Sequence, residues 1–247
     1  MTAYQDFAAL YDSLMDDVDY EAWAKHYERL LSPAPKSRIF ELGCGTGNLT
    51  VRLAKMGYDI VGTDLSPEMI ARAQEKARKS GQKIQFAVQD MTRFSVPRKV
   101  PCIFCGCDGV NYLTTEAQVK SCFSRVFEAL KPGGTFAFDI SAPHKLKSMA
   151  GQMYGEDREE VSYLWMNEQK DGLLEMNLTF FVRQESGLYK RFSERHLQRM
   201  HEPEELKNWL KQTGFENVAA YSEMTMEPWK ETDDRIHFTA KKPEIIR

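Results

Sequence analysis

Between residues 39 and 140 the sequence alternates short β-like runs with amphipathic helical stretches. Alternation of this kind builds a parallel sheet whose faces are covered by helices, so this part of the chain is neither all-α nor all-β. We therefore expect an α/β fold. The runs assigned to strands are IFEL, YDIVGTD, KIQFAVQD, CIFCGC and TFAFDIS.

Two of the intervening helices have clear boundaries in the sequence. The first begins at Ser66-Pro67-Glu68, which combines a capping hydroxyl, a proline in the first turn and an early acidic residue, and it ends at Gly81. In the second, Thr115-x-x-Gln118 fits a capping box, and the pattern breaks at Pro132-Gly133-Gly134. Both helices fall between predicted strands, as a parallel sheet requires.

About sixty residues, 141–201, separate the fifth run from the next helical stretch, EPEELKNWLKQTG. A compact domain rarely contains so long a loop without structure of its own. The runs VSYLWMNE, LLEMNLTFFVRQ and LYKRFSERHLQRM are joined by Asp171-Gly172 and Ser186-Gly187, which are hairpin turn signals. We predict an antiparallel β insertion here, after which two strands near NVAAYSEM and RIHFTAKK complete a seven-stranded mixed sheet.

Charge and cysteine content restrict the partners and the compartment. The chain has 33 Lys and Arg against 36 Asp and Glu, a net charge of -3, so no overall positive field gathers nucleic acid. The amino terminus lacks the basic flank of a signal peptide, and no apolar run approaches the roughly 18 residues of a membrane span. An odd number of cysteines, 5, fits a reducing compartment. We expect a cytoplasmic protein without a membrane partner.

Three of the cysteines form the pattern Cys102-x-x-Cys105-x-Cys107. They lie in an apolar run, VPCIFCGC, and no second Cys or His pair follows at the spacing of zinc ligands. We interpret them as buried strand residues and predict no metal site.

The first predicted strand leads into a helix through the glycine-rich loop Gly43-Cys44-Gly45-Thr46-Gly47. Glycines at such a turn allow a ligand to approach the backbone closely. A dinucleotide-binding fingerprint, G-x-G-x-x-G, requires a third glycine where this chain has Asn48. The loop alone suggests a ligand site, and the less favoured alternative is a tight turn that binds nothing.

Acidic residues stand at the ends of the next two predicted strands. Asp64 ends the second, and a carboxylate there suits the two hydroxyl groups of a ribose. Asp90 ends the third, placed to accept a hydrogen bond from an adenine amino group while Met91 packs on the ring. Because the carboxyl ends of parallel strands meet at one sheet edge, these groups and the glycine loop are expected to share a site.

The segments ELGCGTGNLT, VGTDLSPEMI, FAVQDM and LKPGGTF resemble motifs of the class I S-adenosylmethionine-dependent methyltransferases over roughly residues 37–140. The resemblance implies a Rossmann-like sheet and S-adenosylmethionine as cofactor. It places the methionine part at Glu41 and the glycine loop, the ribose at Asp64 and the adenine at Asp90 and Met91. The implied cofactor-binding residues are Tyr11, Glu41, Gly43, Cys44, Gly45, Gly47, Asp64, Leu65, Met69, Asp90, Met91 and Cys107.

The segment FAALYDSLM further resembles the lid helix of bacterial methyltransferases of types 11, 12 and 25, where the tyrosine matching Tyr11 lies near the methionine end. Phe7, Leu10 and Leu14 fit an ordinary amphipathic helix equally well. The expected organisation has three parts. They are an N-terminal helical lid (1–36), a cofactor-binding core (37–140 and 202–247) and an antiparallel acceptor lid (141–201).

Methyl transfer from a sulfonium is a direct displacement that requires alignment and exclusion of water, while a general base is optional. We therefore assign no catalytic residue. Acceptor contacts are expected from the lid or the loop after the fourth strand, although the lone histidine is as well explained by a structural role. The acceptor-site candidates are Asn111, Tyr112, Arg195, His196 and Arg199.

The lid is also expected to carry aromatic residues, Tyr163, Trp165 and Phe180, that line an aromatic and basic pocket with its arginines and histidine. The competing interpretation is that these aromatic side chains only attach the insertion to the core and that the basic residues face water.

Two motifs of nucleobase methyltransferases are absent. The residues Cys107-Asp108-Gly109-Val110 differ from the Asn or Asp-Pro-Pro-aromatic motif, and Pro101-Cys102, which we place before the fourth strand, is at the wrong end for a nucleophilic cysteine. We expect N- or O-methylation of a small amine, acid or hydroxyl compound. A tRNA base stays an alternative, because Lys76, Arg78 and Lys79 can contact phosphate.

Two further alternatives come from other classes of protein. One is a NAD-dependent oxidoreductase, which Asn48 disfavours, and the other is a binding module that keeps the cofactor pocket without turnover. The sequence is compatible with a monomer or a homodimer.

Overall fold

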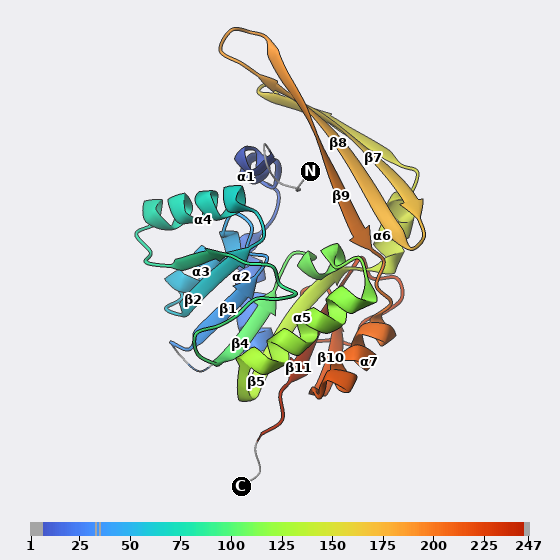
Figure 1. Ribbon diagram of the computed structural model, residues 1–247. Coiled ribbons are helices and arrows are strands. Elements are labelled where there is room, and N and C mark those ends of the chain that lie inside the picture. Colours follow the sequence, from blue (N-terminus) through green and yellow to red (C-terminus); the bar gives the residue numbers. More distant parts are fainter. Residues whose placement is uncertain (1–6, 33, 35, 245–247) are drawn as a thin grey trace.

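The computed structural model, which describes residues 7–32, 34 and 36–244, contains a seven-stranded mixed sheet in the order β10-β11-β5-β4-β1-β2-β3 (Figure 1). Strands β1 to β5 run parallel, while β11 is antiparallel to β5 and β10 antiparallel to β11. The predicted α/β fold with a mixed sheet is therefore confirmed. The strands are β1 (Arg38–Leu42), β2 (Asp59–Asp64), β3 (Gln85–Val88), β4 (Val100–Cys105), β5 (Leu130–Ser141), β10 (Glu216–Ser222) and β11 (Arg235–Lys241).

Helices cover both faces of this sheet. On one face, α5 and α7 bury Val119, Phe123 and Leu206 against Phe136 and Phe238 of the strands. On the other face, α2 packs on β4 and β5, α3 packs on β2, and α4 lies beside α3 against β2 and β3. None of the helices in the described part of the chain is both long and apolar enough to cross a membrane. The helices are α2 (Tyr20–Leu31), α3 (Asn48–Lys55), α4 (Pro67–Lys79), α5 (Glu116–Ala129) and α7 (Pro203–Thr213).

The helix starts follow the capping signals of the sequence. The Ser66 hydroxyl accepts a hydrogen bond from the Met69 amide, and Thr115 and Gln118 form the reciprocal capping box. One predicted boundary is wrong, because α5 ends at Ala129 and β5 begins at Leu130, so Pro132-Gly133-Gly134 belongs to the strand. There the Gly133 amide donates to the carbonyl of Lys242, which extends the pairing.

The insertion forms a separate four-stranded antiparallel sheet in the order β6-β7-β8-β9. At the hairpin between its second and third strands, Asp171 and Gly172 both have positive φ, 52° and 76°, as a tight two-residue turn requires. The sequence did not reveal β6, whose five side chains are all exposed and show no alternation, nor the short helix before it. The elements are α6 (Pro143–Met149), β6 (Met153–Asp157), β7 (Val161–Lys170), β8 (Leu173–Arg183) and β9 (Tyr189–Arg199).

The antiparallel sheet stands at the carboxyl ends of the parallel strands, because β5 leads into it through α6 (Figure 1). Its inner face packs on the N-terminal segment: Phe7 stacks on Phe180 with ring centroids 5.0 Å apart, and Met176 and Leu178 join the same cluster. The expected single lid helix is instead a short 3-10 turn, η1 (Phe7–Ala9), followed by α1 (Tyr11–Leu14). Residues 1–6, 33 and 35 of the expected 1–36 lid lie outside the described residues.

Candidate active site

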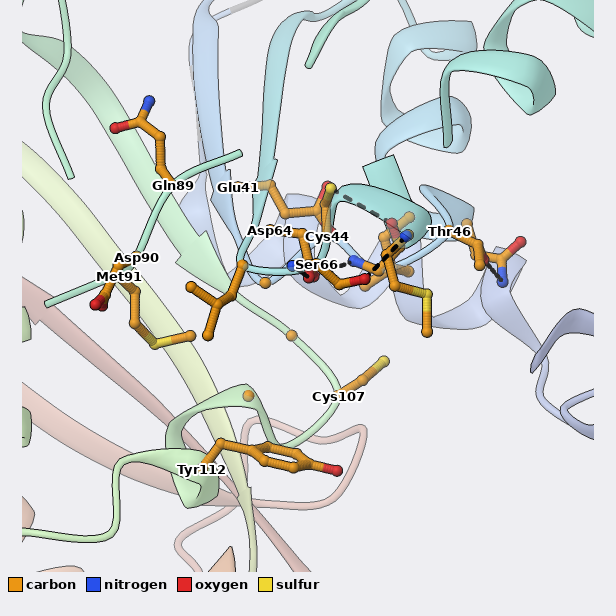
Figure 2. Close-up of a pocket in the computed structure, with 18 of the residues that line it drawn as sticks. Glu41, Cys44, Thr46, Asp64, Ser66, Gln89, Asp90, Met91, Cys107 and Tyr112 are labelled. Carbon is orange, nitrogen blue, oxygen red and sulfur yellow. Dashed lines mark hydrogen bonds between the residues drawn. The ribbon is translucent and has the colours of Figure 1, made fainter. Parts of the chain in front are cut away.

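A pocket of about 310 Å³ lies at the carboxyl edge of the parallel sheet, where the ends of β1, β2, β3 and β4 meet the N-terminal segment (Figure 2). It brings together every residue of the expected cofactor-binding set except Gly47. The members that line it are Tyr11, Glu41, Gly43, Cys44, Gly45, Asp64, Leu65, Met69, Asp90, Met91 and Cys107.

The glycine loop after β1 turns with positive φ at Gly43, Gly45 and Gly47. A Cβ added to Gly45 meets no atom within 4 Å, so this part of the backbone faces open pocket. Gly47 does not line the pocket, so its cofactor contact stays a prediction. It is the N-cap residue of α3, and a Cβ there would lie 3.0 Å from the Cβ of Ala73 in α4, so close helix packing also favours glycine at this position.

Asp64 fixes the shape of this loop. Its carboxylate accepts hydrogen bonds from the backbone amides of Gly45, at 2.8 Å, and Ser66, at 2.9 Å. Burial raises the pKa of Asp64, while these amide donors act in the opposite direction. The side chain thus closes the turn from β2 and still borders the pocket, where the ribose contact stays a prediction.

Glu41, the residue before the last of β1, carries a buried carboxyl group, with 2% of its surface exposed. The Thr50 hydroxyl donates a hydrogen bond to it. Burial raises the pKa of Glu41 to about 8, and the negative charge of Asp64 acts in the same direction. Such a group holds its proton near neutral pH until a cation binds beside it.

Asp90 and Met91 follow β3. The Asp90 carboxylate already accepts from the amide of Thr92, at 2.8 Å, and from its hydroxyl, at 2.7 Å, and it forms an ion pair with Arg93. Asp90 nevertheless borders the pocket, so an adenine contact stays a prediction. Gln89 and Gln118 also line this end and were not identified from the sequence, because no motif marks isolated glutamines.

The N-terminal segment is bonded directly to the glycine loop. Asp12 of α1 accepts hydrogen bonds from the Thr46 hydroxyl at 2.6 Å, the Asn48 amide at 3.0 Å and Lys76 at 2.9 Å. Burial opposes ionisation of Asp12, but the bonds from Lys76 and Thr46 outweigh it and lower its pKa. Lys76 is therefore committed to this cluster and is not the phosphate contact that the tRNA alternative requires.

Tyr11 and Tyr20 of the N-terminal region line the pocket. Burial raises the pKa of Tyr11 well above its ordinary value and that of Tyr20 to about 12, so both phenols are neutral. Tyr20 was not among the sequence candidates, because it reads as an ordinary apolar position at the start of α2.

Among the acceptor-site candidates, Tyr112 lines the pocket and His196 contacts Tyr112. Tyr112 belongs to η2 (Gly109–Tyr112), the turn after β4, and it lines the pocket. His196 of β9 is buried, and its Nδ1 lies 3.2 Å from the Tyr112 hydroxyl. Burial lowers the pKa of His196 to about 4, so the imidazole is neutral at pH 7.

The other three acceptor candidates lie elsewhere. Asn111 is fully buried, and its amide bonds to the backbone of Ser141 and the carbonyl of Arg199. Arg195 points outward and pairs with Glu175 at 2.6 Å. Arg199 lies 3.8 Å from a carboxylate oxygen of Glu205. These contacts are structural and do not reach the pocket.

The expected aromatic and basic pocket in the lid is likewise not formed by these side chains. Phe180 stacks on Phe7 inside the lid cluster, and the Tyr163 hydroxyl donates to Glu156. Neither Tyr163, Trp165 nor Phe180 lines the pocket described above. Phe180 instead attaches the insertion to the N-terminal segment, which is close to the competing interpretation of these aromatic residues.

Cys102 and Cys105 are buried in β4, as expected, whereas Cys107 follows the strand with φ 55° and lines the pocket. Pro101 and Cys102 lie within β4, not before it, but still at the end far from the pocket. Over the residues that the structure describes, no three His, Cys, Asp or Glu side chains are arranged to hold a metal ion.

Several known proteins are similar to this chain. Residues 39–134 match a family described as a methyltransferase domain. A protein of Geobacillus sp. (strain WCH70), provisionally named a methyltransferase, is 37% identical over 97% of this chain and 99% of its own length.

Two solved structures have the same fold. A S-adenosylmethionine-dependent methyltransferase from Clostridium acetobutylicum ATCC 824 is 33% identical, with a TM-score of 0.87 over 97% of this chain and 99% of that one. The sugar N-methyltransferase KedS8 from Streptoalloteichus sp. ATCC 53650 is 18% identical, with a TM-score of 0.81 over 99% of this chain and 95% of that one. At that identity the second likeness concerns the fold alone.

Proposed function

The chain belongs to the class I S-adenosylmethionine-dependent methyltransferases, and from this premise we propose that it methylates a nitrogen or oxygen atom of a small acceptor molecule. The oxidoreductase alternative has no support in this family. When bound, S-adenosylmethionine supplies a methyl group on a positively charged sulfur, activated for displacement.

The pocket has the features that such a ligand requires. Open backbone at Gly45 allows close approach, and the buried Glu41 offers a carboxyl group to the ammonium of the methionine part. We assign the ribose to Asp64 and the adenine to Asp90 and Met91, all of which border the same cavity.

The charge of the pocket carries the proposal for the acceptor. Glu41, Asp64 and Asp90 are acidic, and no Lys or Arg occurs among the described residues that line it. A carboxylate or phosphate acceptor would lose its hydration without gaining a cationic side chain of the protein as a partner, which is costly in a partly enclosed site. Amines and hydroxyl compounds are therefore favoured over acids and over a tRNA substrate.

The enclosure of the pocket supports a small acceptor as well. The N-terminal segment, through Tyr11 and Tyr20, and the turn carrying Tyr112 border the same cavity. Aligning an acceptor with a methyl carbon and excluding water are the main catalytic requirements of this displacement. We propose that the N-terminal segment and the antiparallel sheet together form the acceptor lid.

The test is methyl transfer to defined probes. The protein is incubated with S-adenosylmethionine and, separately, with a primary amine, a phenol, an aliphatic alcohol, a carboxylic acid or bulk tRNA, and S-adenosylhomocysteine is quantified by mass spectrometry. We expect turnover with amine or hydroxyl probes. Methylation of tRNA or of the acid alone would contradict the proposal, and bound cofactor without turnover of any probe would favour a binding module.

A further inference from the structure

A hydrogen-bonded pair links the antiparallel sheet to the pocket. Tyr112, in the turn after β4, lines the cavity, and its hydroxyl lies 3.2 Å from Nδ1 of His196 on β9. In Figure 2 Tyr112 lies on the opposite side of the pocket from Glu41 and Asp64, with Cys107 between them in the view. The two residues are 84 positions apart in the sequence, so only the fold brings them together.

The surrounding contacts hold β9 and this turn in fixed register. The Asn111 amide donates to the carbonyls of Ser141, at 3.1 Å, and Arg199, at 3.0 Å, which ties the turn to β5 and β9. Two residues after His196 on β9, the Gln198 side-chain amide donates a hydrogen bond to the Asp108 carboxylate at 2.7 Å. Two contacts between β9 and the turn, and a third from the turn to β5, therefore hold Tyr112 and His196 together.

His196 itself is well packed. Only 4% of its surface is exposed, and the ring of Phe7 meets it edge to face with centroids 6.0 Å apart. An imidazole kept neutral by burial can take a hydrogen bond on Nδ1. A tyrosine hydroxyl has one hydrogen and two acceptor lone pairs, so its oxygen can still accept a hydrogen bond when it donates to His196.

We propose that Tyr112, positioned by His196, accepts a hydrogen bond from the N–H or O–H of the methyl acceptor and so aims the attacking lone pair at the methyl carbon. This inference rests on the proposed function and restricts it to acceptors whose reacting atom carries a hydrogen. It assigns the His196 proton to Nε2. Tyr112 contacts the acceptor, while His196 is a positioning residue on the lid.

The transfer balances without a dedicated base. The lone pair of the acceptor nitrogen or oxygen forms the new bond to carbon, and the electron pair of the broken sulfur–carbon bond stays on sulfur. The hydrogen that the acceptor shares with Tyr112 is then released as a proton to water, because methylation makes the reacting atom more acidic. Tyr112 contributes orientation and ends the reaction as a neutral phenol.

The test compares two ligands whose identity is known. Sinefungin carries an amine-bearing carbon where S-adenosylmethionine has its methylated sulfur, whereas S-adenosylhomocysteine has no group at the methyl position. The sinefungin ammonium therefore probes the acceptor side with an N–H donor. Binding of both ligands is measured by calorimetry for each variant. The readout is the dissociation constant of S-adenosylhomocysteine divided by that of sinefungin, a ratio that falls when sinefungin binding weakens.

We expect Tyr112→Phe to weaken sinefungin roughly tenfold or more relative to S-adenosylhomocysteine, as loss of a hydrogen bond to a charged group does. His196→Leu should lower the ratio similarly, and His196→Asn should restore most of it, because an asparagine amide oxygen can occupy the place of Nδ1. Arg195→Ala is the matched control, since its side chain leaves the same strand on the outer face.

An unchanged ratio in Tyr112→Phe would overturn the proposal. If the ratio falls in Tyr112→Phe but is unchanged in a folded His196→Leu, His196 has no part in positioning Tyr112. The melting temperatures of the variants, with His196→Asn as a milder change, distinguish loss of positioning from unfolding. The outcome is independent of the acceptor class. If the ratio falls as expected but the enzyme methylates only tRNA or acids, the proposed function fails while the role of Tyr112 stands.

Discussion

The buried carboxyl group of Glu41 predicts that cofactor binding depends on pH. With a pKa of about 8 in the free protein, only roughly one Glu41 side chain in ten is ionised at pH 7. The ammonium group of S-adenosylhomocysteine, placed beside this carboxyl group as we propose, favours the ionised form and lowers its pKa. Binding then releases a proton, so affinity should increase as pH rises toward 8.

The expected magnitude follows from the linkage between binding and ionisation. If the bound pKa falls below 6, the dissociation constant should decrease about fiftyfold between pH 6 and pH 8, which is about 2.3 kcal/mol. Above pH 8 the dependence should level off, because Glu41 is then already ionised in the free protein. Around pH 7 calorimetry in two buffers of different ionisation enthalpy should detect nearly one proton released for each ligand bound.

Glu41→Gln provides the matched control, since its amide oxygen can still accept from Thr50. The variant should bind S-adenosylhomocysteine more weakly at pH 8 and show no slope between pH 6 and pH 8. Because the pKa of Glu41 is higher in the folded than in the unfolded protein, the free energy of unfolding falls as pH rises toward 8. Glu41→Gln lacks this ionisation, so its free energy of unfolding should fall less than that of the wild type over the same range. Equal slopes in both proteins would refute the placement of Glu41 at the ammonium.

Three other substitutions test the remaining parts of the site. Asp64→Ala should weaken S-adenosylhomocysteine binding by roughly 1 to 3 kcal/mol, and unchanged affinity in calorimetry would remove Asp64 from the site. Gly45→Val should abolish binding, because φ is 53° and the added side chain enters open pocket, and normal binding by a folded variant would place the ligand elsewhere. Asp12→Asn should speed S-adenosylhomocysteine release severalfold in stopped-flow measurements by weakening the bonds to Thr46 and Lys76, and an unchanged release rate would exclude Asp12 as a closure contact.

The sequence predicts the cofactor half of the pocket well because that half depends on strand ends and on backbone conformation. Glu41, Asp64 and Asp90 each lie within two residues of the end of a parallel strand, and strand order alone brings such positions to one edge. Gly47 differs from the other two glycines of the loop, because its positive φ serves close helix packing. A glycine motif does not distinguish this requirement from close approach of a ligand.

The lid side was less predictable because the direction of a strand side chain depends on its parity. Along β9, Glu194, His196 and Gln198 face inward, whereas Arg195 on the same strand faces outward. The sequence shows several basic residues there but does not say which parity is buried, since polar residues occupy the inward positions. The inward side chains are buried by the turn after β4, and the bonded residues Asp108 and Gln198 are 90 positions apart in the sequence.

The N-terminal segment and the antiparallel sheet contact the pocket through different residues. Asp12 of the N-terminal segment accepts a hydrogen bond from Thr46 inside the glycine loop, so movement of α1 and the shape of that loop are coupled. The antiparallel sheet instead contacts Tyr112 through His196, on the side of the pocket that we propose for the acceptor. Because Phe7 stacks on Phe180, opening of the N-terminal segment must also uncover the inner face of the sheet. Release of the methylated product and exchange of the cofactor are therefore expected to share one opening motion.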